Sequence, residues 1–278
     1  MKIIECPRDA MQGLSEFIPT SKKVAYLNSL LKVGFDTLDF GSFVSPKHIP
    51  QMRDTAQVLM QLDASDTKLL AIVANLRGAK DACQFDRISY LGYPFSVSET
   101  FQQKNTHTSI DTALITLDRI QSTCQQNKKS LVLYLSMAFG NPYGDYWHED
   151  IVAKWSEKLS DMGIEIIALS DTIGVSNRKN ISGLFKLLIS EYPHIEWGAH
   201  LHSSLKNWRE KIQSAYDNGC RRFDGAIMGY GGCPMANDDL IGNIPTEKLL
   251  SFLQEHKISN NIDTLAFESA YNKALETF

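Results

Sequence analysis

Residues 164–200, IEIIALSDTIGVSNRKNISGLFKLLISEYPHIEWGAH, contain the pattern that decides the fold. An apolar run of strand length, Ile164–Leu169, is followed by a segment with helical periodicity, Asn180–Glu191. A second strand-like run, Glu196–His200, comes next. A strand, a helix and another strand in this order are typical of a β-α-β unit, so the stretch predicts an α/β fold.

The same alternation continues along the whole chain. Further strands are predicted at Lys2–Cys6, Thr37–Phe40, Lys68–Val73, Arg87–Leu91, Ser130–Ser136 and Arg222–Ala226. Further helices are predicted at Lys22–Val33, Ile110–Gln126, Ile151–Met162, Asn207–Asn218 and Thr246–Gln254. Eight strands, each followed by a helix at a spacing of about 35 residues, predict a (β/α)₈ TIM barrel, because a doubly wound sheet usually closes with fewer units.

No linker rich in proline, glycine or serine interrupts this alternation. Residues 1–278 are therefore expected to form a single TIM-barrel catalytic domain. Thr264–Thr277 predicts an additional C-terminal helix, which packs on the outside of the barrel or on a second subunit. Because proteins of this size often form symmetric oligomers, we expect a homodimer.

Composition and charge exclude several classes of protein. The chain is 43% hydrophobic and 22% charged, which excludes disordered, collagen-like and coiled-coil proteins. Lys and Arg together number 28 against 32 Asp and Glu, giving a formal charge of -4. No basic block is dense enough to follow a phosphate backbone, so we expect no nucleic-acid partner.

Membrane and secretory segments are not predicted either. The apolar runs are much shorter than the roughly 20 residues needed to cross a bilayer. The chain enters the strand-like run Lys2–Cys6 directly, without the features of a signal peptide, which predicts a cytoplasmic protein. Its five cysteines form no C-x-x-C pair, which disfavours a disulfide framework or a zinc-thiolate site.

Polar residues are concentrated where the predicted strands end, which is the active-site face of a TIM barrel. His200 and His202 are two residues apart, so in an extended chain both imidazoles point into the barrel. An isolated pair of this kind can equally be two ordinary polar residues. Asp9 from the adjoining first strand adds a carboxylate, and Asn243 offers a carbonyl oxygen. Nitrogen and oxygen ligands without thiolate predict Mg²⁺ or Mn²⁺, or else Zn²⁺.

Three further charged residues lie near this predicted metal site. Arg8 is a permanent cation that can stabilise a developing oxyanion, or it can pair with Asp9 to hold a loop. Asp39 and Asp171 end the second and sixth strands, where they orient the ligands or Arg8, or cap the following helices.

Cys233 follows glycines 229, 231 and 232 on a loop that is long for a barrel connection. A lone cysteine is usually a buried structural residue, which is the interpretation of Cys83, Cys124 and Cys220. The glycine-rich setting of Cys233 instead predicts an exposed thiol that is brought to the site when the loop closes.

Several of these stretches occur together in one known family. They are Pro7-Arg8-Asp9 with Gln12, Ser42-Phe43-Val44-Ser45-Pro46-Lys47, Pro50-Gln51-Met52, Asn141-Pro142-Tyr143, Asp171-Thr172-Ile173-Gly174-Val175, His200-x-His202, Gly231-Gly232-Cys233-Pro234, and Gly242-Asn243 with Thr246-Glu247. With these motifs the chain resembles the 3-hydroxy-3-methylglutaryl-CoA lyase family of metal-dependent TIM barrels over nearly its whole length.

The resemblance implies a role for each motif residue. Asp9, His200, His202 and Asn243 match the metal ligands of the family. Arg8 matches the cation that stabilises an enolate, and Cys233 matches a cysteine on a lid.

This sequence also departs from the family pattern at particular positions. Asp39 stands where the family usually has a glutamate, whereas Asp171 matches its strand-six aspartate. Cys6 precedes the Pro-Arg-Asp turn in place of a glycine, and Ser203 follows the second histidine in place of an aspartate.

The reaction implied by the resemblance is cleavage of 3-hydroxy-3-methylglutaryl-CoA, an acyl-CoA, to acetoacetate and acetyl-CoA. His200 or an aspartate beside it would take the hydroxyl proton, and Cys233 would protonate the enolate. Related alternatives are a 2-isopropylmalate-type synthase and a 4-hydroxy-2-oxoacid aldolase. A catalytically silent barrel that binds an acyl-CoA is an alternative of another class.

Overall fold

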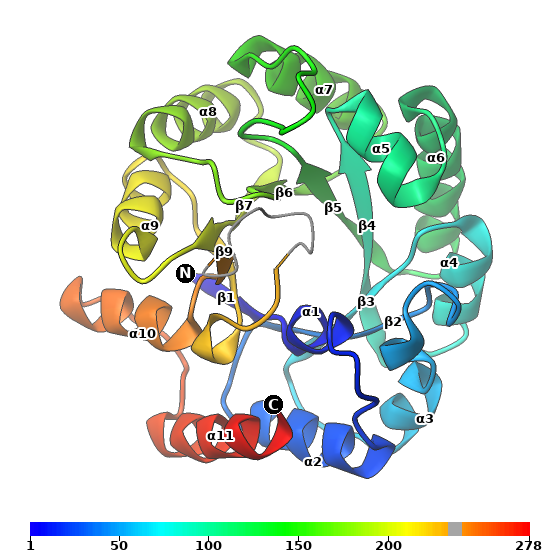
Figure 1. The fold of residues 1–278 in the computed structure, drawn as a ribbon, viewed down its shortest axis with the longest axis vertical. Coiled ribbons are helices and arrows are strands. Elements are labelled where there is room, and N and C mark those ends of the chain that lie inside the picture. Colours follow the sequence, from blue (N-terminus) through cyan, green and yellow to red (C-terminus); the bar gives the residue numbers. More distant parts are fainter. Residues whose placement is uncertain (233–240) are drawn as a thin grey trace.

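Eight parallel strands close into a barrel in the computed structural model, which describes residues 1–232 and 241–278 (Figure 1). In order around the barrel they are β1 (Lys2–Glu5), β2 (Thr37–Ser42), β3 (Lys68–Ile72), β4 (Ile88–Ser96), β5 (Ser130–Ser136), β6 (Ile166–Ser170), β7 (Glu196–His200) and β9 (Arg222–Gly225). The barrel closes where β1 pairs with β9, with Ile3 opposite Phe223. The predicted TIM barrel and its eight strands are confirmed, although β4 extends to Ser96, beyond its predicted end.

The helices lie around the outside of the barrel, except for the short α1 (Pro7–Gln12), which lies over one end of it (Figure 1). They are α1 (Pro7–Gln12), α2 (Thr20–Leu30), α3 (Thr55–Met60), α4 (Leu76–Cys83), α5 (Glu99–Thr106), α6 (Ile110–Gln126), α7 (Glu149–Asp161), α8 (Arg178–Glu191), α9 (Trp208–Asp217), α10 (Thr246–Glu255) and α11 (Thr264–Thr277). Two short strands, β8 (His202–Ser203) and β10 (Gly242–Asn243), form an antiparallel pair beyond the end of β7. Among the helices of the described residues, none is long and apolar enough to cross a bilayer.

The strands alternate between two apolar layers. On β5, Leu131, Leu133 and Leu135 belong to the large core between strands and helices. Val132 and Tyr134 belong to a second cluster, whose other members come from β3, β4 and β6 and fill the inside of the barrel. Because successive side chains of a strand point to opposite faces, a residue next to an outward apolar one points into the barrel. This rule fixes which polar side chains reach the interior.

The additional C-terminal helix predicted at Thr264–Thr277 is α11, and it lies beside α2 on the outside of the barrel (Figure 1). Phe267, Ala270 and Ala274 form its buried side. The segment before it is fixed where the backbone N–H of Asp263 donates to the carbonyl of Val33 over 2.8 Å. Packing on the barrel itself, one of the two expected roles, is therefore what the structure shows.

Glu5 connects the end of β1 to the segment that follows β9. Its fully buried carboxyl accepts hydrogen bonds from the Ile227 backbone N–H, over 2.9 Å, and from the Thr246 hydroxyl. Burial raises the pKa of Glu5 to about 8, although these two hydrogen bonds oppose the change. Glu5 is therefore largely protonated in the folded chain at neutral pH.

This shifted pKa predicts how stability depends on pH. Between about pH 4.5 and 8 the folded chain holds a proton on Glu5 that the unfolded chain has released, so the free energy of unfolding falls as pH rises through this window. Glu5→Gln, which cannot ionise, should gain stability relative to the wild type from pH 5 to pH 8.5 in urea unfolding. Glu268→Gln, at an exposed position on α11, should follow the wild type throughout. Parallel curves for the wild type and Glu5→Gln would contradict the assignment.

Candidate active site

A cavity of about 540 Å³ opens at the carboxyl ends of the strands. Its polar lining includes Arg8, Asp9, Gln12, Tyr134, His200 and His202. These residues come from α1, β5, β7 and β8, which are far apart in the sequence. The structure therefore brings together the first and seventh strand ends, as the barrel prediction requires.

Helix α1 begins immediately after β1 and presents three polar side chains to this cavity. Pro7 occupies its first turn, where a missing N–H costs nothing. Gln12 Nε2 donates to Asp9 Oδ1 over 2.8 Å, and Arg8 Nη1 donates to the same oxygen over 3.2 Å. Arg8 Nη1 also donates to Gln12 Oε1 over 2.9 Å. The three side chains thus fix one another on a single turn of helix.

Asp39 holds the other edge of the Arg8 guanidinium. Both Nε and Nη2 of Arg8 donate to its carboxylate, with Nε 2.9 Å from Oδ2. Asp39 is fully buried and does not line the cavity. Burial by itself would lower the pKa of Arg8, but Asp39 and Asp9 raise it well above its ordinary value. Arg8 therefore remains a cation, and Asp39 acts by positioning it.

Asp9, His200 and His202 form the group that fits a metal ion. One ligand atom from each lies within 4.8 Å of the others. Burial alone would raise the pKa of Asp9, but Arg8 and the two histidines lower it, so the carboxylate is ionised. Burial, followed by the proximity of His200, lowers the pKa of His202 to about 4. The site therefore offers one anion and a neutral imidazole.

The hydrogen bonds of His202 show which nitrogen is free. Its Nδ1 lies 3.2 Å from the Thr172 carbonyl, which can only accept a hydrogen bond, so the ring proton is on Nδ1. Nε2 is buried and has no hydrogen-bond partner among the described residues. A buried lone pair without a partner is costly in a protein, and a metal ion would satisfy it. The oxygen and nitrogen donor set also agrees with Mg²⁺, Mn²⁺ or Zn²⁺.

Asn243 lies beside this group, on β10. It pairs with His202 across the β8–β10 ribbon, and its Nδ2 donates to Asp9 Oδ2 over 2.6 Å. The backbone N–H of Gly232 donates to the same oxygen over 3.3 Å. Gly231 has a positive φ of 87°, and a Cβ there would lie 2.7 Å from the Asp9 carbonyl. Only glycine allows the loop to approach α1 so closely.

Asp171 lies at the end of β6, as expected, but it faces away from the cavity lining. Its carboxylate is 1% exposed and lies 2.6 Å from the Nζ of Lys211. Lys211 Nζ also donates to the His202 carbonyl over 2.6 Å. Asp171 therefore positions the backbone of His202 through a buried lysine on α9.

Cys233, the predicted lid thiol, lies outside the described residues.

Sequence reasoning missed two charged residues behind the site, Lys211 and Asp224. Lys211 precedes the core residue Ile212 on α9, and nothing in the sequence distinguishes it from an exposed helical lysine. Asp224 follows the outward-facing Phe223 on β9, so strand alternation alone could have placed it inside the barrel. Its Oδ2 lies 3.1 Å from His200 Nδ1.

Cys6 is a further buried neighbour of His200. With His200 and Asp224 it forms a second group whose ligand atoms lie within 4.8 Å of one another. Burial raises the pKa of the Cys6 thiol well above its ordinary value, and nearby carboxylates raise it further. Neither Cys6 nor Asp224 lines the cavity, so Asp9, His200 and His202 are the group that could hold a metal ion within reach of a substrate.

The amino-acid sequence of the chain is similar to a known protein family and to characterised members of it. The HMGL-like family model matches residues 2–273. A hydroxymethylglutaryl-CoA lyase of Bacillus subtilis is 31% identical over 257 residues, which cover 92% of this chain and 85% of that protein.

Solved structures show the same similarity. The crystal structure of the Bacillus subtilis HMG-CoA lyase has a TM-score of 0.93 at 30% identity, covering 99% of this chain and 92% of that one. An HMG-CoA lyase from Acinetobacter baumannii, in complex with coenzyme A and 3-methylmalate, has a TM-score of 0.89 at 30% identity. That match covers 98% of this chain and 88% of the other.

The Lys211–Asp171 pair gives a testable expectation. Lys211→Met leaves an uncompensated buried carboxylate, so the free energy of unfolding should fall by about 3–5 kcal/mol in urea or guanidinium titrations. The double variant Lys211→Met with Asp171→Asn should recover part of this loss. Lys206→Met, at an exposed position, should have little effect. A single Lys211→Met variant as stable as the wild type would show that the pair does not hold the backbone at His202.

Proposed function

The chain belongs to the HMGL-like family, and we propose that it is a hydroxymethylglutaryl-CoA lyase, a carbon-carbon lyase that cleaves 3-hydroxy-3-methylglutaryl-CoA to acetoacetate and acetyl-CoA. The observation that carries the proposal is the grouping of Asp9, His200 and His202 beside Arg8 in one cavity. A complete donor set also argues against a silent acyl-CoA-binding barrel. The synthase and aldolase alternatives have no comparable support.

Asp9, His200 and His202 would hold the divalent ion, with Asn243 as a further ligand. The unpartnered Nε2 of His202 and the ionised Asp9 carboxylate fit such an ion. We propose Mg²⁺ or Mn²⁺, with Zn²⁺ as the alternative. The chemistry that a bound ion supplies is Lewis-acid polarisation of the substrate's hydroxyl and carboxylate oxygens.

His200 is the proposed acceptor of the hydroxyl proton. Its Nδ1 is bonded to Asp224, so only Nε2 faces the cavity. Both predicted roles of His200 therefore fall on Nε2, which would help to hold the ion and is the ring nitrogen that could accept a proton at the cavity.

Arg8 is the proposed partner of the negative charge that forms when the carbon-carbon bond breaks. The bond's electron pair passes to the thioester fragment as an enolate, while the other fragment leaves as acetoacetate. Asp39 and Gln12 fix the guanidinium in advance, so little reorganisation is needed at the moment of reaction. The enolate carbon must then gain a proton, and Cys233 is the proposed donor through its match to the family's lid cysteine.

The remaining expectations are also proposals. The substrate is an acyl-CoA whose acyl group enters the cavity of about 540 Å³. A cytoplasmic location and a homodimer remain predictions, to be tested by cell fractionation and by sedimentation. The function itself is tested by incubating the protein with 3-hydroxy-3-methylglutaryl-CoA and Mg²⁺ or Mn²⁺, with acetoacetate as the readout.

Metal dependence is the first prediction from this function. Exhaustive chelation should abolish acetoacetate formation, and added Mg²⁺ or Mn²⁺ should restore it. His202→Ala should lower activity by about 10²-fold or more and weaken Mn²⁺ binding, because it removes a ligand. His194→Ala changes an exposed histidine and should leave both properties unchanged. Full activity after chelation would overturn the metal assignment.

The role of Arg8 gives the second prediction. Lysine keeps the charge at this position but cannot donate two parallel hydrogen bonds to Asp39 while facing the cavity. Arg8→Lys should therefore lower kcat by about 10² to 10³, or roughly 3–4 kcal/mol of transition-state stabilisation. Arg209→Lys, on the surface, is the matched control. A raised KM with unchanged kcat would instead mean that Arg8 anchors the substrate.

A further inference from the structure

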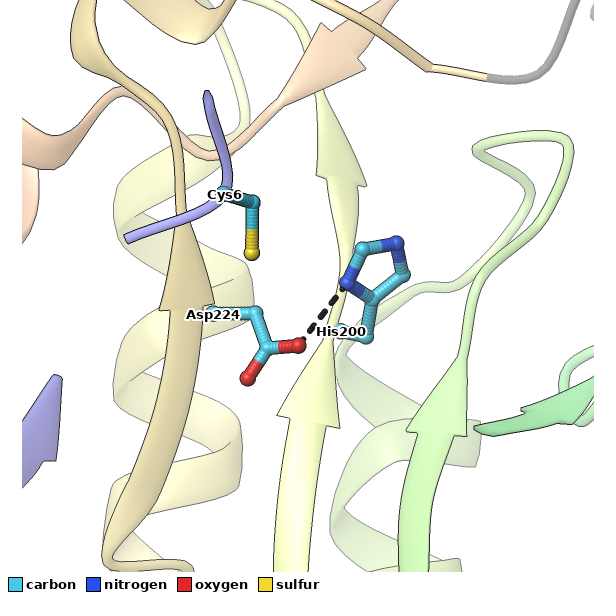
Figure 2. A group of neighbouring side chains, drawn as sticks. All are labelled: Cys6, His200 and Asp224. Carbon is cyan, nitrogen blue, oxygen red and sulfur yellow. Dashed lines mark hydrogen bonds and ion pairs between the residues drawn. The ribbon is translucent and has the colours of Figure 1, made fainter. Parts of the chain in front are cut away.

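Asp224 lies next to His200 (Figure 2) and, unlike His200, does not line the cavity. It points into the barrel from β9, and its Oδ2 lies 3.1 Å from Nδ1 of the imidazole. Figure 2 shows the other ring nitrogen of His200 directed away from this carboxylate. His200 therefore lies between two acidic groups, with Asp224 at Nδ1 and Asp9 on the cavity side.

We propose that Asp224 is a positioning residue that keeps the His200 proton on Nδ1 and thereby presents the Nε2 lone pair to the cavity. A carboxylate accepts hydrogen bonds and cannot donate one, so the hydrogen of this contact belongs to the imidazole. The opposite tautomer would place a hydrogen on Nε2, where it would block coordination and proton uptake alike. The role given to Asp224 in metal binding and catalysis rests on the proposed function. The tautomer of His200 does not depend on that function.

The burial of Asp224 indicates that its role is the contact with His200 and not a contribution to stability. Its side chain is fully buried, and its only side-chain hydrogen bond to the described residues is the one to His200. Its Oδ1 has no hydrogen-bond partner among them. A buried carboxylate with half of its acceptors unused is expensive, so it is a poor way to gain stability.

Two neighbouring groups bear on the direction of the contact between Asp224 and His200. Arg222, two residues earlier on β9, points into the same interior and is 1% exposed. Its guanidinium supplies a positive charge near the carboxylate. The Cys6 thiol lies close to both residues but bonds back to the Ile4 carbonyl over 3.8 Å. Cys6 therefore does not compete for Nδ1.

Histidines that bind metals commonly donate their second ring N–H to a carboxylate, and removing that carboxylate typically weakens metal binding by 10- to 100-fold. We expect Asp224→Ala to weaken Mn²⁺ binding by about this factor, measured by calorimetry or by EPR of the free ion. Asp224→Asn should lie between this variant and the wild type, because its amide oxygen can still accept from Nδ1.

Cys6→Ala is the matched control within the same cluster. It removes a buried neighbour of His200 and Asp224 without removing a hydrogen-bond partner of the imidazole. Mn²⁺ affinity should therefore stay within about threefold of the wild type, well below the loss expected for a carboxylate that orients a ligand. An equal loss in Cys6→Ala and Asp224→Ala would show that packing alone is responsible and would overturn the proposal.

A second readout needs neither metal nor substrate. In metal-free protein with ¹⁵N-labelled histidine at pH 9, long-range ¹H–¹⁵N spectra report which ring nitrogen carries the proton. Comparison with His200→Gln assigns the signal. We expect Nδ1–H in the wild type and a shift toward Nε2–H in Asp224→Ala.

An Nε2–H tautomer in the wild type, or an unchanged tautomer in Asp224→Ala, would overturn the inference. The proposed function fails separately, by the absence of acetoacetate from a protein whose tautomer and metal binding are as expected.

Discussion

Buried charges must be paired, because burial removes them from water, and this constraint shapes the site. Arg8 is held by Asp39, Asp171 by Lys211, and His200 by Asp224. Arg8 and His200 line the cavity, and each is held by a carboxylate that does not line it. The Asp171–Lys211 pair lies outside the lining and acts on the backbone of His202.

The two sides of the candidate site differ in how their side chains are held. On the α1 side, Arg8 belongs to a network that satisfies it on both edges, so its position is overdetermined. On the β7 side, His200 depends on one hydrogen bond behind the ring. The histidine is thus the part of the site whose orientation is most sensitive to a single substitution.

Much of the fold was predictable because each strand is a short apolar run and the helices have clear periodicity. Helices α1, α3, α4 and α5, each of six or eight residues, were not predicted. They are too short for a hydrophobic stripe, and tertiary contacts hold them. The grouping of Asp9 with His200 and His202 followed from the barrel rule, since strand ends meet at one face.

The partners behind the site were harder to predict from the sequence. Asp171 was placed at the correct strand end, whereas Asp39 lies in the middle of β2, which continues to Ser42. The partners of both residues depend on the register between strands and on the rotation of α9. A helical lysine such as Lys211 is expected to be exposed, unless a buried carboxylate is known to lie opposite it. For Asp224, the alternation of side chains along β9 indicates that it points into the barrel. Its contact with His200 could not be predicted in this way, because it depends on the pairing of β7 with β9.

The β8–β10 ribbon has a consequence for how the enzyme can change. The chain before position 233 is fixed to Asp9 through Gly232, and the chain after position 240 is fixed to His202 through the pairing of Asn243. Both attachments meet at residues of the group proposed to bind the metal, so a substitution at Gly232 or Asn243 would change the backbone here and the surroundings of that group together. The sequence of this ribbon can therefore vary less freely than that of an ordinary surface hairpin.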